Sequence, residues 1–176
     1  STKEDAIAGA MDIVAETIAD DFELKKILRA IVFKEAVIET STKKGSEEKE
    51  TFLVYKMYHE YSELCSKMPA HRVLAVNRGE KEDILKVKLN YPLDKITDTA
   101  EKAYIKSDIN KDVMVDTIKD SLNRLMLPSL ERELKSNITE MAEERAIAVF
   151  GENLRNLLMQ SPLYAKTVLS SKTTNP

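Results

Sequence analysis

The sequence has 176 residues, of which 43% are apolar and 32% are charged, a balance typical of a folded globular protein rather than a disordered chain. The net charge of −3 excludes a surface that attracts polyanions as a whole, so any nucleic-acid contact must come from a local patch. No apolar run is long enough to cross a bilayer and the single cysteine excludes an internal disulfide, so we expect a cytoplasmic protein with no membrane partner.

The first part of the chain predicts helices and one short strand. Four glycines and five prolines favour helix over sheet. Ser1 and Glu4 have the spacing of a capping box and precede a helix with apolar residues every three or four positions. A second helix is expected from about Phe22 to Phe33, and β-branched residues predict a strand at 37–42. The apolar positions between Ser46 and Met68 predict a further helix.

In the rest of the chain, the pattern of apolar residues changes once from helical spacing to alternation and then becomes helical again. Apolar and polar residues alternate at 84–91, which predicts a strand with one solvated face, closed by Pro92. Beyond Pro92 the pattern is helical and ends in a long helix at about 128–159. We therefore expect a mainly α multi-helix bundle with a small two-stranded β element, at about 37–42 and 84–91. A division into a mixed part, 1–92, and a helical part, 93–163, is compatible with this pattern.

The segment AHRVLAVNRGEKE, residues 70–82, is the strongest candidate for a functional site. A structural interpretation ends a helix near Arg78 and places Gly79 just beyond it with positive φ, so that no ligand is needed. A functional interpretation uses charge, because six basic residues against three acidic ones lie between Lys67 and Lys88. The predicted phosphate contacts are Arg72, Arg78, Lys81, Lys86 and Lys88. These side chains could equally form a solvated face, or protect an edge strand from aggregation.

Other reactive side chains give no recognisable catalytic set. Neither a GxxxxGK[ST] nor a GxGxxG run is present, and His59 and His71 lack the neighbours of a zinc site. Cys65 follows Leu64 on an apolar face and is expected to be a packed thiol. The tyrosines at positions 55, 58 and 61 are interpreted as core and boundary residues. We therefore assign no catalytic residue, no metal, no cofactor and no small-molecule substrate, and predict that the protein is not an enzyme.

Three blocks of the sequence resemble the bacterial Tex transcription accessory proteins, in order and with matching spacing. They are EDAIAGAMDIVAE (4–16), PAHRVLAVNRGEKEDILKVKL (69–89) and LMLPSLERELKSNITEMAEERAIAVFGENLRNLLMQSPL (125–163). The block HRVLAVNRGEKE is the most specific, and the resemblance covers almost the whole chain.

This resemblance implies a helical central region with a helix-turn-helix-like element, preceding RNase H-like, helix-hairpin-helix and OB-fold RNA-binding modules. The Gly-Val-Asp-Pro segment expected after Leu169 is replaced by SSKTTNP, so those modules are expected to lie outside this sequence. The implied function is a non-catalytic scaffold of a nucleic-acid-binding transcription accessory protein, with weak phosphate-backbone contacts of its own. The alternative is a protein module that docks on the transcription machinery without touching nucleic acid.

Overall fold

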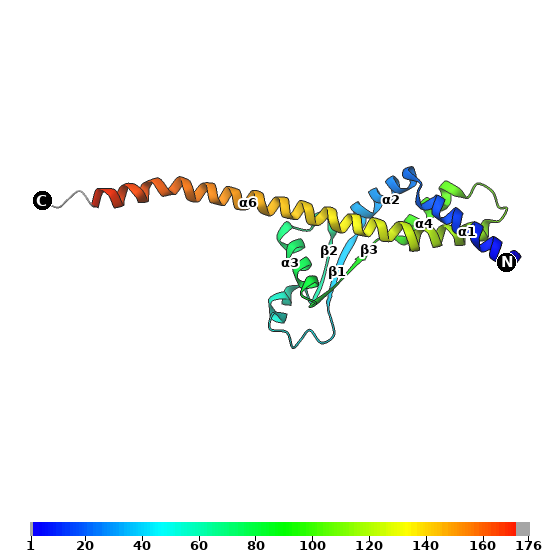
Figure 1. Ribbon diagram of the computed structural model, residues 1–176, viewed down its shortest axis with the longest axis horizontal. Helices are drawn as coiled ribbons and strands as arrows, with labels where there is room; N and C mark the ends of the chain where they lie inside the picture. The colour runs from blue at the N-terminus through cyan, green and yellow to red at the C-terminus, as the bar shows by residue number, and fades with distance from the viewer. Residues whose placement is uncertain (1, 172–176) are drawn as a thin grey trace.

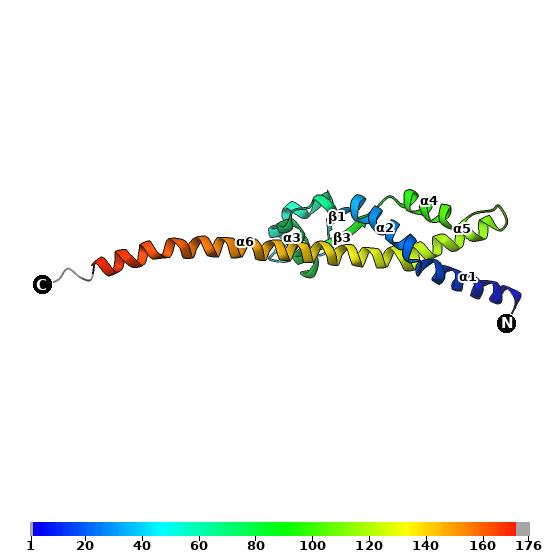
Figure 2. The same ribbon diagram turned by 90° about the horizontal axis from the view of Figure 1, so that it is seen from above.

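The computed structural model describes the backbone of residues 2–171 and the side chains of residues 2–160. The fold is mainly helical with a small antiparallel sheet, which confirms the predicted class. One long helix runs along the molecule, with the sheet beside its N-terminal half and other helices gathered at and beyond its N-terminal end (Figures 1 and 2). The helices are α1 (Lys3–Ala19), α2 (Phe22–Glu35), α3 (Ala70–Lys81), α4 (Leu93–Tyr104), α5 (Lys111–Asp120) and α6 (Leu127–Ser171). The strands are β1 (Val37–Thr42), β2 (Glu60–Leu64) and β3 (Leu85–Asn90).

The N-terminal helices begin at side-chain caps. The backbone N–H of Asp5 donates to the Thr2 hydroxyl at 3.4 Å, and the Thr2 N–H donates to the Asp5 carboxylate at 3.0 Å. The capping box therefore lies one residue later than the predicted pair of Ser1 and Glu4, and Ser1 lies outside the described residues. Asp21 caps α2 by accepting from the Leu24 N–H at 3.0 Å. A two-residue turn thus joins α1 to α2, while the helix-turn-helix-like element stays a prediction.

The sheet contains the two predicted strands and a third that sequence reasoning missed. β1 lies in the centre and pairs antiparallel with both β2 and β3. The predicted helix from Ser46 to Met68 is wrong, because this segment forms a 3-10 helix at Phe52–Tyr58 and then β2. On the side of β1 that does not face β3, the backbone groups pair with those of β2. This pairing decides the structure of the segment in spite of its local helical spacing.

Contrary to the prediction, the long helix does not begin near residue 128 as a separate element. α5 continues through a π-helical segment, Ser121–Met126, directly into α6. Proline lacks an N–H, and its ring clashes with the carbonyl four residues earlier, so a regular helix cannot pass through Pro128 unchanged. The wider π turn, in which the Leu127 N–H donates to the Leu122 carbonyl, accommodates the proline without ending the helix.

Helix α6 has 45 residues, or roughly 68 Å at 1.5 Å per residue, and its two halves differ in burial. Its first half packs on the rest of the protein, and Leu130, Leu134 and Ala142 are buried there. Residues 143–160 are all exposed, and this part of α6 projects away from the body (Figure 2). The backbone continues as helix to Ser171, beyond the predicted end near residue 159.

Candidate nucleic-acid interface at the turn between α3 and β3

The segment 70–82 forms α3 and the turn into β3, as the structural interpretation predicted, but Gly79 does not end the helix. Helix α3 continues to Lys81, and Asp83 takes the left-handed conformation, with φ 63°. The Asp83 N–H donates to the Glu80 carbonyl at 3.1 Å, and the Ile84 N–H donates to the Gly79 carbonyl at 3.0 Å. These two bonds are those of a Schellman motif, in which aspartate occupies the position that usually holds glycine.

Gly79 is needed for close packing rather than for backbone conformation. A Cβ atom at this position would lie 2.6 Å from Cδ1 and 2.8 Å from Cγ of Leu85, and 3.0 Å from Cδ1 of Tyr55. Tyr55 and Leu85 are both buried in the core, so neither can easily move away. The glycine therefore lets α3 approach β3 and the 3-10 helix, and it does not form a phosphate-binding loop.

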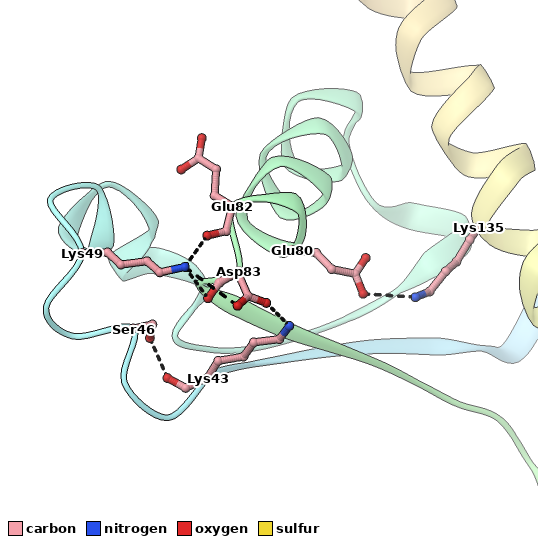
Figure 3. A network of polar contacts seen from close by, with 7 residues as sticks. All are labelled: Lys43, Ser46, Lys49, Glu80, Glu82, Asp83 and Lys135. Carbon is pink, nitrogen blue, oxygen red and sulfur yellow. Dashed lines mark hydrogen bonds and ion pairs between the residues drawn. The ribbon is translucent and has the colours of Figure 1, made fainter.

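The acidic residues of the turn bind lysines from distant parts of the chain (Figure 3). The Asp83 carboxylate accepts a hydrogen bond from Lys43, and its second oxygen lies 3.9 Å from Lys49 Nζ. The hydrogen bond and charge of Lys43, together with the charge of Lys49, lower the pKa of Asp83. Lys49 also donates to the Glu82 carbonyl at 2.8 Å and thereby ties the loop after β1 to the end of α3.

Arg72 is the predicted contact residue most engaged within the protein. Its Nη1 lies 3.2 Å from the Glu63 carboxylate and 3.3 Å from the Tyr61 hydroxyl, both on β2. The guanidinium carbon also lies 5.9 Å from the centre of the Tyr61 ring, a cation–π distance. These contacts attach α3 to β2, so we assign Arg72 a structural role.

The other four predicted contact residues are exposed but belong to two separate elements. Arg78 and Lys81 lie in the last turn of α3, where the helix dipole favours cations. Lys86 and Lys88 lie on the solvated face of β3, where their β1 neighbours are Ser41 and Glu39. Such cations can hold phosphate oxygens one at a time, but the described contacts do not join them into a single pocket.

Sequence reasoning missed the lysines that fold onto this corner of the molecule. Lys43 and Lys49 come from the loop after β1, and Lys135 of α6 reaches Glu80 at 3.5 Å. Each lies at least 33 residues from its partner, so spacing along the chain gives no signal for these pairs. Lys43 and Lys49 lie at the Asp83 carboxylate and Lys135 lies at the Glu80 carboxylate, whereas Lys49 meets Glu82 at its backbone carbonyl.

The remaining reactive side chains have structural surroundings. Cys65 is buried, and burial raises the pKa of its thiol to about 11, as expected for a packed thiol. His59 Nε2 lies 3.0 Å from the Phe52 carbonyl, within the same short segment. Tyr55 and Tyr58 are buried and Tyr61 packs beside them, which confirms their core and boundary roles. Within the described residues, we find no group of three histidine, cysteine, aspartate or glutamate side chains placed to hold a metal ion.

Comparison with known proteins shows the family. The Tex central region-like family model matches residues 1–150, which include the α3–β3 turn and the packed half of α6. The chain belongs to this family. It is 46% identical over 170 residues to the uncharacterized protein YdcI of Bacillus subtilis, covering 96% of this chain and 24% of YdcI. It is 35% identical over 173 residues to the transcriptional accessory protein Tex of Neisseria gonorrhoeae, covering 93% of this chain and 22% of that protein.

A more distant relative is also named for transcription. The transcription elongation factor SPT6 homolog of Arabidopsis thaliana is 25% identical over 177 residues, covering 91% of this chain and 10% of that protein. The Tex-like chain thus spans about a quarter or less of the length of these relatives. Among the residues that the structure describes, no helix is both long and apolar enough to span a membrane.

Proposed function

We propose that this chain is the non-catalytic helical scaffold of a Tex-like transcription accessory protein and works in the cytoplasm. The observation that carries the proposal is the projecting half of α6. Its apolar residues Ile147, Phe150, Leu154 and Leu157 recur at intervals of three and four, which places them on one face of the helix. This face is exposed among the described residues, as expected for a surface on which further modules of a longer protein pack.

The scaffold adds weak contacts to the phosphate backbone of nucleic acid through Arg78, Lys81, Lys86 and Lys88. Separate exposed cations give affinity that is independent of sequence and that falls steeply with salt. Relatives support this role, because the Neisseria gonorrhoeae and Arabidopsis thaliana proteins are named for transcription and a human relative is named S1 RNA-binding domain-containing protein 1.

Fluorescence anisotropy with labelled single- and double-stranded oligonucleotides tests these contacts. We expect the logarithm of affinity to fall with the logarithm of salt concentration with a slope of about 0.7 to 0.9 per phosphate contacted. Changing Arg78, Lys81, Lys86 and Lys88 together to glutamate should abolish binding. The matched control reverses an equal number of exposed cations on the helical bundle and should leave the slope unchanged: Lys26, Lys102, Lys111 and Lys119. Equal loss in both variants would show that net charge alone controls binding.

A second candidate function is protein docking without nucleic-acid contact, and an apolar groove favours it. The groove has a volume of about 660 Å³ and lies between α6 and the start of α3, with Met68, Val73 and Met141 in its wall. Met141→Asp should prevent a transcription-machinery protein from co-purifying after nuclease treatment, whereas Met159→Asp, outside the groove, should not. Loss of the partner on nuclease treatment of the unaltered protein would instead favour the nucleic-acid scaffold.

A further inference from the structure

Strand β3 is one of the two edge strands of the sheet, with β1 along one side of it and a groove bordered by α6 along the other. In the order β2-β1-β3, the described residues supply no further strand beyond β3. The edge of a sheet carries backbone N–H and C=O groups that can pair with an added strand. Which residues offer these groups follows from the register with β1.

Along β3, the backbone N–H and C=O groups of successive residues point alternately toward β1 and toward the open edge. The Lys43 N–H donates to the Ile84 carbonyl at 2.9 Å, just beyond the paired strands. In an antiparallel ladder the hydrogen-bonded pairs alternate, so Lys86 and Lys88 also direct their backbone groups toward β1. The backbone groups of Val87 and Leu89 therefore point away from β1, toward the open edge.

A groove runs along this edge. It has a volume of about 360 Å³ and is lined by residues 87–91 and Leu93 on one side and by Glu131 and Lys135 of α6 on the other. The backbone groups of Val87 and Leu89 thus face a space with walls, and Tyr91 and Leu93 add apolar surface at one end. Such a groove suits an extended segment better than a flat surface would.

The charges around the groove favour an acidic occupant. Lys88 and Lys135 line it, and Lys86 lies two residues along the same strand face. The Glu131 carboxylate already accepts a hydrogen bond from the Tyr91 hydroxyl. The side chains of Lys135 and Glu80 are each about 40% exposed, so their ion pair is weak and Lys135 can pair with another carboxylate instead. Among the described residues, Lys86 and Lys88 take part in no ion pair, and the residues opposite them on β1 are Ser41 and Glu39.

We propose that the outer edge of β3 binds a short, extended, acidic peptide segment by strand addition. The segment exchanges backbone hydrogen bonds with Val87 and Leu89, and its carboxylates lie near Lys86, Lys88 and Lys135. This interaction goes beyond the scaffold role, because it gives the region a protein ligand of defined chemistry at a site distinct from the apolar groove.

Amide hydrogen exchange of the whole 176-residue chain, followed by NMR, tests the proposal directly. The probe is a short synthetic peptide in which glutamate alternates with valine. On binding, the amides of Val87 and Leu89 should exchange roughly tenfold more slowly or better, because they gain a partner. The amides of Lys86 and Lys88, which already bond to β1, should change little. A peptide of the same charge that is N-methylated at alternate residues should not bind, since it cannot complete the ladder.

Charge variants provide the second arm. Lys86→Glu combined with Lys88→Glu should weaken binding of the acidic peptide by about tenfold or more and allow a lysine–valine peptide to bind instead. The control pair, Lys26→Glu with Lys119→Glu on the helical bundle, should leave both affinities unchanged. Unchanged exchange at Val87 and Leu89, or equal binding of the N-methylated peptide, would overturn the proposal. So would an oligonucleotide that binds at these lysines while the acidic peptide does not.

Discussion

The two halves of α6 have similar spacings of apolar residues, but these residues are buried in the first half and exposed in the second. In the first half, Leu130 and Leu134 are at most 2% exposed, and the helix packs against α2 and α3. In the second half, the apolar residues of the exposed face are between 45% and 71% exposed: Ile147, Phe150, Leu154 and Leu157. One continuous helix therefore contains a stretch that forms the core and a stretch that the described residues leave uncovered.

The difference shows what helical periodicity does and does not determine. A spacing of three and four residues places apolar side chains on one face, whatever surrounds the helix. The contribution of that face to stability depends on the surface that covers it, because only apolar area removed from water stabilises the fold. The projecting half should consequently contribute little to the stability of this chain, while remaining suited to bind another surface.

The largest expected effect comes from the same substitution made in each half. Leu134→Ala should lower the free energy of unfolding by about 2–5 kcal/mol, because it leaves a cavity between α6 and the core. Leu157→Ala should change it by no more than about 0.5 kcal/mol, since Leu157 is exposed and alanine favours helix. Urea unfolding followed by circular dichroism measures both. Equal destabilisation would mean that the second half is covered in solution.

Two of the glycines within helices, Gly79 and Gly151, should respond to substitution with opposite signs. Gly79→Ala should destabilise the protein by about 1–3 kcal/mol, because the added methyl group meets Leu85 and Tyr55 in a packed core. Gly151→Ala should stabilise it by up to about 1 kcal/mol, because open space surrounds Gly151 and alanine has the higher helix propensity. Thermal unfolding of the two variants measures the sign. A stabilising Gly79→Ala would show that α3 and β3 pack less closely than described.

Most of the helices and two strands were predictable because their patterns are local. The apolar spacing of α1, α2 and α6 and the alternation in β3 each require information from a single segment. The strand β2 was not predictable in this way. Tyr55, Tyr58 and Tyr61 have helical spacing, but their segment forms a 3-10 helix and then β2. Strand β2 forms because it pairs with β1, and most of the paired residues are more than twenty positions apart in the sequence. Propensity and spacing cannot report that pairing.

The candidate site shows the same limit. The sequence correctly predicted a helix, a turn and a strand at residues 70–91, and it identified the local basic excess. It misplaced the positive φ at Gly79, because the role of this glycine depends on Leu85 and Tyr55 packing against it. It also gave no sign that Arg72 would bind Glu63, or that Lys43 would bind Asp83, since these contacts exist only in the folded chain.

A smaller effect should come from the polar contact that holds the first half of α6 beside the sheet. The Tyr91 hydroxyl donates to Glu131, so Tyr91→Phe should destabilise the protein by about 0.5–1.5 kcal/mol at neutral pH. The control, Glu152→Gln in the projecting half, should change stability by less than about 0.5 kcal/mol.

Burial, and then the hydrogen bond and charge of Glu131, raise the pKa of Tyr91. The stabilisation is therefore complete below the unfolded pKa of about 10 and is lost as pH rises above it. Urea unfolding of wild type and Tyr91→Phe across this range should show their difference shrinking at alkaline pH, and a constant difference would contradict the assignment.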